Sequence, residues 1–308
     1  MSALEHKVEE YLALRRALGY KLAGYDAVLS GFTAWLDSAG ASVVTAERAL
    51  AWAQSRPTSS PVRQRQRLSI VRGFAEYLRT VDPRTEVPAA DLLPARYHRS
   101  APYLYSSAEI SALMAAARSV RPPLKAATYE TLIGLLACTG LRFGEAAGLD
   151  RCDVDMVEAS LLVRFGKNAR SRHVPIHETT VAALSTYAAQ RDRLLARPTA
   201  PSFFVSTRGG RLAPSSVQGV FAMLRRACGL DQHGHGRPPR VHDLRHSFVV
   251  RTMLEWYREG VDVQARLPLL STFLGHVDPK ATYWYQQAAP ELLCLVAARL
   301  EAGVGEQS

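Results

Sequence analysis

The stretch Leu274-Gly275-His276-Val277-Asp278-Pro279-Lys280-Ala281-Thr282-Tyr283-Trp284-Tyr285 decides how the C-terminal half of the chain is organised. Apolar residues recur at helical spacing up to Leu274, and Gly275 stands where a helix commonly ends. Pro279 suits the first position of a new short helix, which carries Tyr285. The sequence therefore predicts a helix, a turn and a second short helix that bring a histidine and a tyrosine hydroxyl together.

Three motifs further upstream supply cationic side chains. TGLRFGE (residues 139–145) and HDLRH (residues 242–246) each open a predicted helix, and Gly166-Lys167-Asn168 forms the turn of a predicted hairpin within residues 161–176. Two arginines, a lysine, two histidines and a tyrosine suit phosphoryl transfer without a metal. Guanidinium groups stabilise the equatorial oxygens of the transition state while a hydroxyl attacks in line.

The motifs TGLRFGE, GK followed by RHVPI, HDLRH, LGH and a tyrosine nine residues later occur in the order found in tyrosine recombinases. Residues 106–290 resemble this family of phage-integrase-type site-specific recombinases. The resemblance implies a catalytic set of Arg142, Lys167, His242, Arg245, His276 and Tyr285. It also implies strand exchange through a covalent 3′-phosphotyrosyl intermediate with no cofactor and no metal, as in integration or transposition.

The roles of the catalytic set follow from the same resemblance. Arg142 and Arg245 bind the non-bridging oxygens, Lys167 protonates the departing 5′ oxygen, and Tyr285 attacks. His242 and His276 help with hydrogen bonding and proton transfer, whereas His246 packs behind them. Arg164, Arg170 and Arg172 are alternatives to Lys167, and Tyr283 is the alternative nucleophile.

The fold class is expected to be mainly α. Residues 1–98 form a small helical domain, residues 99–105 a linker, and residues 106–308 a mostly helical catalytic domain with a small antiparallel sheet. A proline-rich stretch without periodicity, Asp82 to Pro102, predicts the linker region, and the capping box Ser106–Glu109 starts the second domain. The resemblance implies a SAM-like core-binding domain followed by the DNA breaking-rejoining enzyme fold.

Charge and composition favour a polyanionic partner. The 308 residues carry a formal net charge of +10, and the pI is about 9.7. A predicted helix starting at Ser60-Pro61 carries several arginines, which are either a solvated face or a DNA-binding surface. The predicted DNA contacts are Arg63, Arg65, Arg67, Arg72, Arg170 and Arg172.

The partner and compartment follow from the same features. The resemblance implies double-stranded DNA with inverted-repeat binding sites, on which the protein forms a homotetramer or heterotetramer. Long apolar runs and a signal peptide are missing from the sequence, and the four cysteines are scattered, which predicts a cytoplasmic, nucleoid-associated protein without membrane contact. An apolar helix at residues 290–300 packs on its own domain or on a neighbouring subunit.

Three other functions remain open from the sequence. His242 and His246 are four residues apart, as in zinc hydrolases, but no third ligand is evident. A type IB topoisomerase shares the catalytic residues but relaxes supercoils. A decayed, catalytically silent DNA-binding protein would keep the fold without the chemistry.

Overall fold

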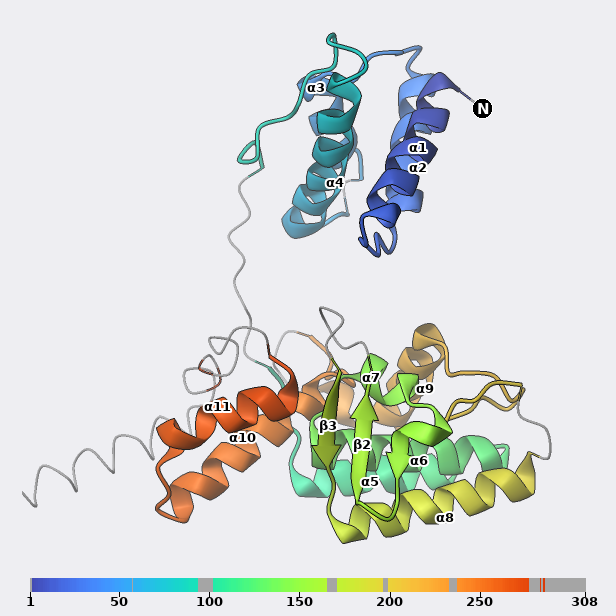
Figure 1. Cartoon of the computed structure of the whole chain (residues 1–308), viewed down its shortest axis with the longest axis vertical. Helices are drawn as coiled ribbons and strands as arrows, with labels where there is room; N and C mark the ends of the chain where they lie inside the picture. Colours follow the sequence, from blue (N-terminus) through green and yellow to red (C-terminus); the bar gives the residue numbers. More distant parts are fainter. Residues whose placement is uncertain are drawn as a thin grey trace, which may run out of the picture. The chain divides into compact units, whose positions relative to one another are not determined.

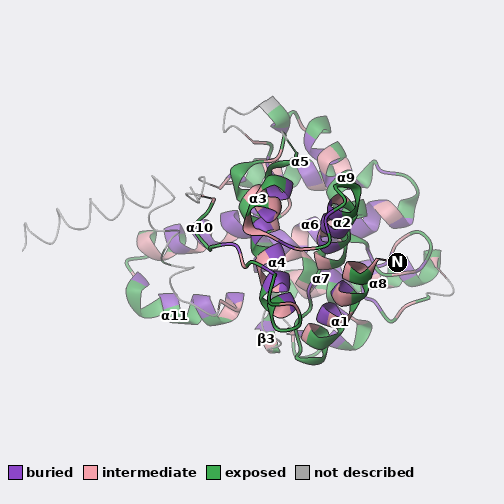
Figure 2. Cartoon of the chain, turned by 90° about the horizontal axis from the view of Figure 1, so that it is seen from above, coloured by how far each residue is buried: buried purple, intermediate pink, exposed green. Residues whose placement is uncertain are grey.

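The computed structural model describes residues 2–56, 58–93, 102–164, 171–195, 199–232, 237–276, 283 and 285. The chain divides into two compact units, Met1–Arg99 and Ser100–Ser308 (Figure 1). Buried residues, coloured purple in Figure 2, form one hydrophobic cluster in the first unit and two in the second. Among the described residues, no helix combines the length and the apolar character that crossing a bilayer requires.

The described part of the first unit is helical, as the sequence predicts. Side-chain oxygens of Ser2, Thr45 and Ser60 accept hydrogen bonds from the first turns of three of its helices, so local capping sets where these helices begin. The helices are α1 (Ala3–Ala17), α2 (Tyr25–Ser38), α3 (Ala46–Gln54) and α4 (Pro61–Arg79).

The first part of the predicted linker belongs to this unit. The Glu86 N–H donates to the Val44 carbonyl at 2.9 Å, and the Glu86 carboxylate accepts from the Ala46 N–H at 2.9 Å. Thr85 is also buried. The prediction of a linker starting at Asp82 is therefore wrong, because long-range hydrogen bonds that leave no local sequence pattern hold this segment against α3.

The second unit combines helices with a small sheet, which confirms the expected fold class. The sheet is antiparallel in the order β1-β2-β3, and Leu161 pairs with Val174. Its strands are β1 (Val154–Asp155), which the sequence did not predict, β2 (Ser160–Val163) and β3 (Arg172–Pro175). The helices are α5 (Ser107–Arg118), α6 (Pro123–Thr139), α7 (Phe143–Gly148), α8 (Glu178–Leu194), α9 (Pro214–Ala227), α10 (Asp243–Arg258) and α11 (Val263–Leu274).

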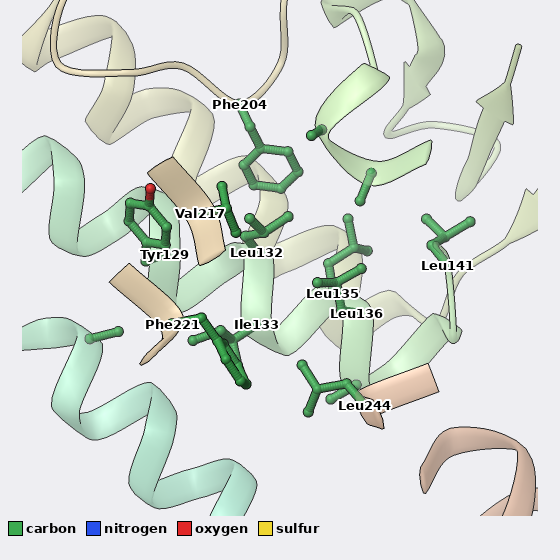
Figure 3. Close-up of a cluster of buried hydrophobic side chains, with 14 of the residues drawn as sticks. Tyr129, Leu132, Ile133, Leu135, Leu136, Leu141, Phe204, Val217, Phe221 and Leu244 are labelled. Carbon is green, nitrogen blue, oxygen red and sulfur yellow. The ribbon is translucent and has the colours of Figure 1, made fainter. Parts of the chain in front are cut away.

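Helix α6 is the centre of the second unit. It contacts α5, α7, α8 and α10, and most of its side chains are buried, with a narrow, partly exposed stripe that includes Glu130, Gly134 and Cys138. Leu132 and Leu136 are each 1% exposed and belong to the cluster with Phe221 and Leu244 (Figure 3). This packing fixes the C-terminal end of α6, which opens into the candidate site. Tyr103 and Tyr105, within the predicted linker, are buried in the same core.

Candidate active site

Two helices end at this site on glycines in the left-handed conformation. Gly140 terminates α6 with φ +60°, and Gly275 terminates α11 with φ +66°. Glycine adopts this conformation without the steric penalty that other residues incur. A Cβ atom on Gly275 would lie 2.7 Å from Nη1 of Arg172, so a larger residue there would displace the guanidinium.

The C-terminal turn of α11 binds three arginines through three consecutive carbonyl groups. Arg172 Nε donates to Phe273 O at 2.8 Å, Arg245 Nη2 donates to Leu274 O at 2.8 Å, and Arg142 Nη2 donates to Gly275 O at 3.2 Å. Carbonyls at a helix C-terminus lack helical partners and carry partial negative charge. The helix end thus brings together guanidinium groups from α7, β3 and α10, which are far apart in the sequence.

Glu145 supplies the negative charge inside this arginine cluster, which we define as Arg142, Arg172 and Arg245. Its carboxylate lies 2.7 Å from Arg142, 3.0 Å from Arg172 and 4.0 Å from Arg245. Burial would raise the pKa of Glu145, but the hydrogen bonds from Arg172 and from the Arg142 N–H outweigh it and lower the pKa below its ordinary value. Arg142 and Glu145, three residues apart, therefore form an ion pair at the start of α7.

Arg245 is the most deeply buried member of the cluster. Only 2% of its surface is exposed, and Nη1 donates to Gly140 O at 2.7 Å, so the side chain bridges the ends of α6 and α11. Burial lowers the pKa of Arg245 to about 10, and the nearby charge of Arg142 adds to this shift. The guanidinium remains charged at neutral pH and is fixed in place by backbone carbonyls.

Tyr285, the predicted nucleophile, lies in the same unit. It is 2% exposed and packs with α10 and α11, whereas the Tyr283 side chain is 40% exposed. His246, which follows Arg245 on α10, lies 2.7 Å from the Tyr285 hydroxyl through Nδ1, so the phenol meets the helix that carries Arg245. The structure therefore brings Arg142 and Arg245 together at the end of α11, with Tyr285 packed against α10 and α11.

His246 is the site residue that the sequence analysis misplaced. Its Nδ1 lies 2.7 Å from the Tyr285 hydroxyl oxygen, so it faces the tyrosine and does not pack behind the site. The spacing of HDLRH contains the signal, because residues four apart share a helix face. The rings of His242 and His246 accordingly meet edge to face with centroids 4.9 Å apart.

His242 precedes α10 and is kept neutral by its surroundings. Burial lowers its pKa, and the Arg245 charge lowers that pKa further. Asp243, next in sequence, is completely buried, accepts a hydrogen bond from the Arg240 N–H at 2.7 Å, and lies 4.0 Å from Nε2 of His246. His276 directly follows Gly275 and is partly exposed.

The remaining predicted residues fall into two groups. Lys167 and Arg170 lie outside the described residues. Arg172 is 14% exposed in its side chain and bonds to Glu145 and to the α11 carbonyl, so it supports the cluster rather than facing solvent. Arg164 pairs with Asp153. Arg172, predicted as a DNA contact, is thus a member of the buried cluster, and Glu145 is a member to which the sequence analysis gave no role.

The arginines of α4 have different surroundings. Arg63 and Arg65 are exposed, and Arg72 pairs with Glu76 at 3.2 Å. The Arg67 guanidinium stacks 3.8 Å over the Trp52 ring and donates to the Ala53 carbonyl. A cavity of about 700 Å³ in the first unit is lined by Arg63 and Arg67 together with Arg56, Trp35 and Trp52.

No group of three or more His, Cys, Asp or Glu side chains that could hold a metal ion occurs among the residues that the structure describes. His246 Nδ1 instead bonds to Tyr285. The arrangement is therefore a cluster of fixed guanidinium groups beside a tyrosine and two histidines, which suits an anion with several oxygen atoms.

Comparisons with known proteins assign the chain to a family. Residues 104–291 match the sequence profile of the phage integrase family. The putative integrase/recombinase y4rB of Sinorhizobium fredii is 41% identical over 311 residues, covering 98% of each chain. The likeness extends through the first unit, so both units are shared with this relative.

Solved structures share the fold. The XerH site-specific recombinase bound to palindromic difH substrate has a TM-score of 0.67 at 17% identity, covering 97% of this chain and 86% of that one. A lambda integrase tetramer bound to a Holliday junction has a TM-score of 0.63 at 17% identity, covering 91% and 79%. From the sequence match and this fold, the chain belongs to the phage integrase family and is a tyrosine-type site-specific DNA recombinase.

Proposed function

We propose that Tyr285 is the nucleophile of this recombinase and that the arginine cluster binds the scissile phosphate. The observation that carries the proposal is the convergence of Arg142 and Arg245, 103 positions apart, on one carboxylate and on adjacent carbonyls beside the tyrosine. Fixed donors of this kind stabilise charge that develops in a transition state, since they need no reorganisation during the reaction.

The reaction proceeds in two reversible transfers. The Tyr285 oxygen forms a bond to phosphorus while the bond to the 5′ oxygen breaks, which leaves a 3′-phosphotyrosyl enzyme and a free 5′-hydroxyl. Arg142 and Arg245 hold the non-bridging oxygens, and His242 and His276 hydrogen-bond to the phosphate. Lys167 gives the departing oxygen its proton. A 5′-hydroxyl from a partner strand then attacks the phosphotyrosine and completes the exchange.

In this proposal the first unit binds DNA and the second unit carries out cleavage and rejoining. The first unit is the core-binding domain, and its exposed Arg63 and Arg65, with Arg67 and Arg72, contact the DNA backbone and groove edges. Arg170 adds a backbone contact from the hairpin, and Arg172 holds Glu145. The DNA carries inverted repeats, as the palindromic substrate of XerH does, and the protein acts on it as a tetramer in the cytoplasm.

Trapping the covalent adduct tests the proposal. The probe is a nicked duplex that carries a binding site selected from a random-sequence pool, and the readout is a DNA-linked band that resists denaturation. The wild-type chain and Tyr283→Phe should form the adduct, while Tyr285→Phe should bind the duplex and form none. An adduct with Tyr285→Phe would overturn the assignment of the nucleophile. A wild-type chain that binds but never forms the adduct would instead favour the catalytically silent DNA-binding protein.

A further inference from the structure

The contact between His246 and Tyr285 has no role in the mechanism above. His246 Nδ1 and the Tyr285 hydroxyl oxygen are 2.7 Å apart, and the two residues are 7% and 2% exposed. We infer that His246 is a catalytic base, whose Nδ1 accepts the phenolic proton of Tyr285 as the tyrosine attacks DNA. The inference rests on the proposed function, because it requires Tyr285 to be the nucleophile.

A tyrosine nucleophile in this position needs a proton acceptor. The ordinary pKa of a phenol is about 10, so the hydroxyl is protonated at neutral pH and is a weak nucleophile. Burial of Tyr285 keeps bulk water away from the oxygen, and an acceptor must lie within hydrogen-bond distance of it. His246 Nδ1 meets that geometric requirement before any DNA is bound.

Asp243 lies on the opposite side of the imidazole. Its Oδ1 is 4.0 Å from His246 Nε2 and has no hydrogen-bond partner among the described residues, although the carboxylate is completely buried. A carboxylate facing Nε2 favours the tautomer with its proton on that nitrogen, which leaves Nδ1 free to accept. It also stabilises the imidazolium that forms, as the orienting carboxylate does in hydrolase triads.

The other charged and titratable groups around His246 are consistent with this role. Arg237 and Arg240 lie 3.6 Å from Asp243 Oδ1 and are the ion-pair partners of that carboxylate. On the same helix, burial and the charge of Arg245 lower the pKa of His242, so the neighbouring ring stays neutral. Burial raises the pKa of Tyr105, which lies near Asp243 and therefore adds no charge. The proton from Tyr285 thus has its most favourable site on His246.

The proton balance closes over one cycle. During cleavage the Tyr285 oxygen binds phosphorus, its proton moves to His246 Nδ1, and the 5′ oxygen leaves with a proton for which Lys167 is the proposed source. During rejoining the attacking 5′-hydroxyl gives up a proton, and His246 returns its proton to the departing phenolate oxygen. The reaction needs no other reactant and leaves every group in its starting state.

The test separates a base from a residue that merely positions the tyrosine. In His246→Asn the amide lies near the place of Nδ1 and can still hydrogen-bond to Tyr285, but it cannot take up a proton at any relevant pH. His246→Ala removes both functions. The initial rate of adduct formation is measured from pH 5.5 to 9.5 on the nicked duplex at saturating protein, with DNA binding and circular dichroism as controls for folding.

Both variants should lose roughly 10²- to 10⁴-fold in rate at pH 7, the usual contribution of general base catalysis. The wild-type rate should level off above the pKa of a histidine, about 6.5, whereas the rate of the Asn variant should keep rising toward about pH 10 as the phenol ionises by itself. If His246→Ala does not fold, the Asn variant alone decides.

Two outcomes would overturn the inference. An Asn variant with the wild-type rate and pH profile would make His246 a positioning residue only. If a variant formed the adduct faster than the wild type, the hydrogen bond between His246 and Tyr285 would hold the tyrosine in an inactive position and would have to break before cleavage. Neither result would contradict the proposed function. That function is contradicted only if Tyr285→Phe still forms the adduct or if the wild type never forms it.

Discussion

The arginines of the second unit and those of α4 carry the same charge but are held in opposite ways. Arg142, Arg172 and Arg245 donate to the last carbonyls of α11 and surround Glu145. On α4, by contrast, Arg63 and Arg65 are exposed, and Arg72 has an exposed partner four residues away. An exposed pair of that kind contributes little to stability.

The two sets differ in the step at which a guanidinium group loses its conformational entropy, which is either folding or DNA binding. In the arginine cluster folding has already fixed the side chains, so a bound phosphate meets donors in place. On α4 the exposed Arg63 keeps its rotamer freedom until DNA arrives, whereas Arg67 is held by the Trp52 ring and the Ala53 carbonyl. The proposed function assigns chemistry to the arginine cluster and DNA affinity to the arginines of α4.

Exchanging arginine for lysine should separate the two sets most clearly. A lysine at position 245 keeps the charge but cannot bridge Gly140 O and Leu274 O, which the guanidinium does at 2.7 and 2.8 Å. Arg245→Lys should lower the rate of adduct formation by at least about 100-fold. Arg63→Lys, the matched control on α4, should leave that rate and the DNA affinity almost unchanged, because exposed phosphate contacts depend mainly on charge.

The measurement is single-turnover adduct formation together with DNA titration at fixed salt. Equal losses of adduct-formation rate in Arg245→Lys and Arg63→Lys would contradict the contrast between the two sets of arginines. A large loss of affinity with an unchanged rate for Arg245→Lys would instead place this residue among the binding arginines.

Neutralising Glu145 tests whether the carboxylate keeps the cluster together. Glu145→Gln leaves three guanidinium groups without their shared negative charge, and breaking such a buried arrangement costs about 3 kcal/mol in the free energy of unfolding. Because the folded pKa of Glu145 is lowered, the wild-type advantage is present above the unfolded pKa of about 4.3 and disappears as the pH falls through the folded pKa.

Urea unfolding of both chains between pH 3 and 7 measures this effect. The gap between wild type and Glu145→Gln should be widest near neutral pH and should narrow below about pH 4. A gap that stays constant across this range would mean that Glu145 acts through packing rather than through its charge.

Substitution of Gly275, which lies against Arg172, should have a smaller effect on stability and on the rate of adduct formation. Gly275→Ala and Gly229→Ala both place a Cβ atom on a left-handed residue, with φ +66° and +70°, which costs about 1 kcal/mol each. Around Gly229 no atom lies within 4 Å of the new Cβ, whereas Arg172 Nη1 lies 2.7 Å away at Gly275. Gly275→Ala should therefore lose more stability than its control and should also slow adduct formation.

Thermal unfolding and adduct kinetics of the two alanine variants provide the comparison. Identical behaviour at both positions would show that the site tolerates a shift of Arg172, and the cluster would then be less rigid than its contacts indicate.

Much of the fold could be predicted because local signals determine where its elements begin and end. Ser106 caps a helix and Gly275 ends one as expected, and the hairpin of β2 and β3 follows from two strand-like runs around a turn. Each of these signals lies within a few residues of the feature that it specifies, so one sequence is enough to recognise it.

The missed features depend on contacts between distant segments. The 85–86 segment joins the first unit through hydrogen bonds to residues about 40 positions away, and Arg172 meets Phe273 O across 101 positions. The sequence analysis placed His246 behind His242, because local spacing could not reveal that His246 meets Tyr285 from another segment. Motif order located Tyr285, and only packing revealed its partner.

The last turn of α11 has a consequence for how the enzyme loses activity. Because three guanidinium groups donate to the carbonyls of residues 273, 274 and 275, unwinding that single turn breaks one hydrogen bond of each group at once, while the α6 core remains intact. Amide hydrogen exchange measures the free energy of opening this turn. Catalysis should be lost at the temperature at which the turn opens. On warming, the recombinase should lose activity at a lower temperature than the one at which the second unit unfolds.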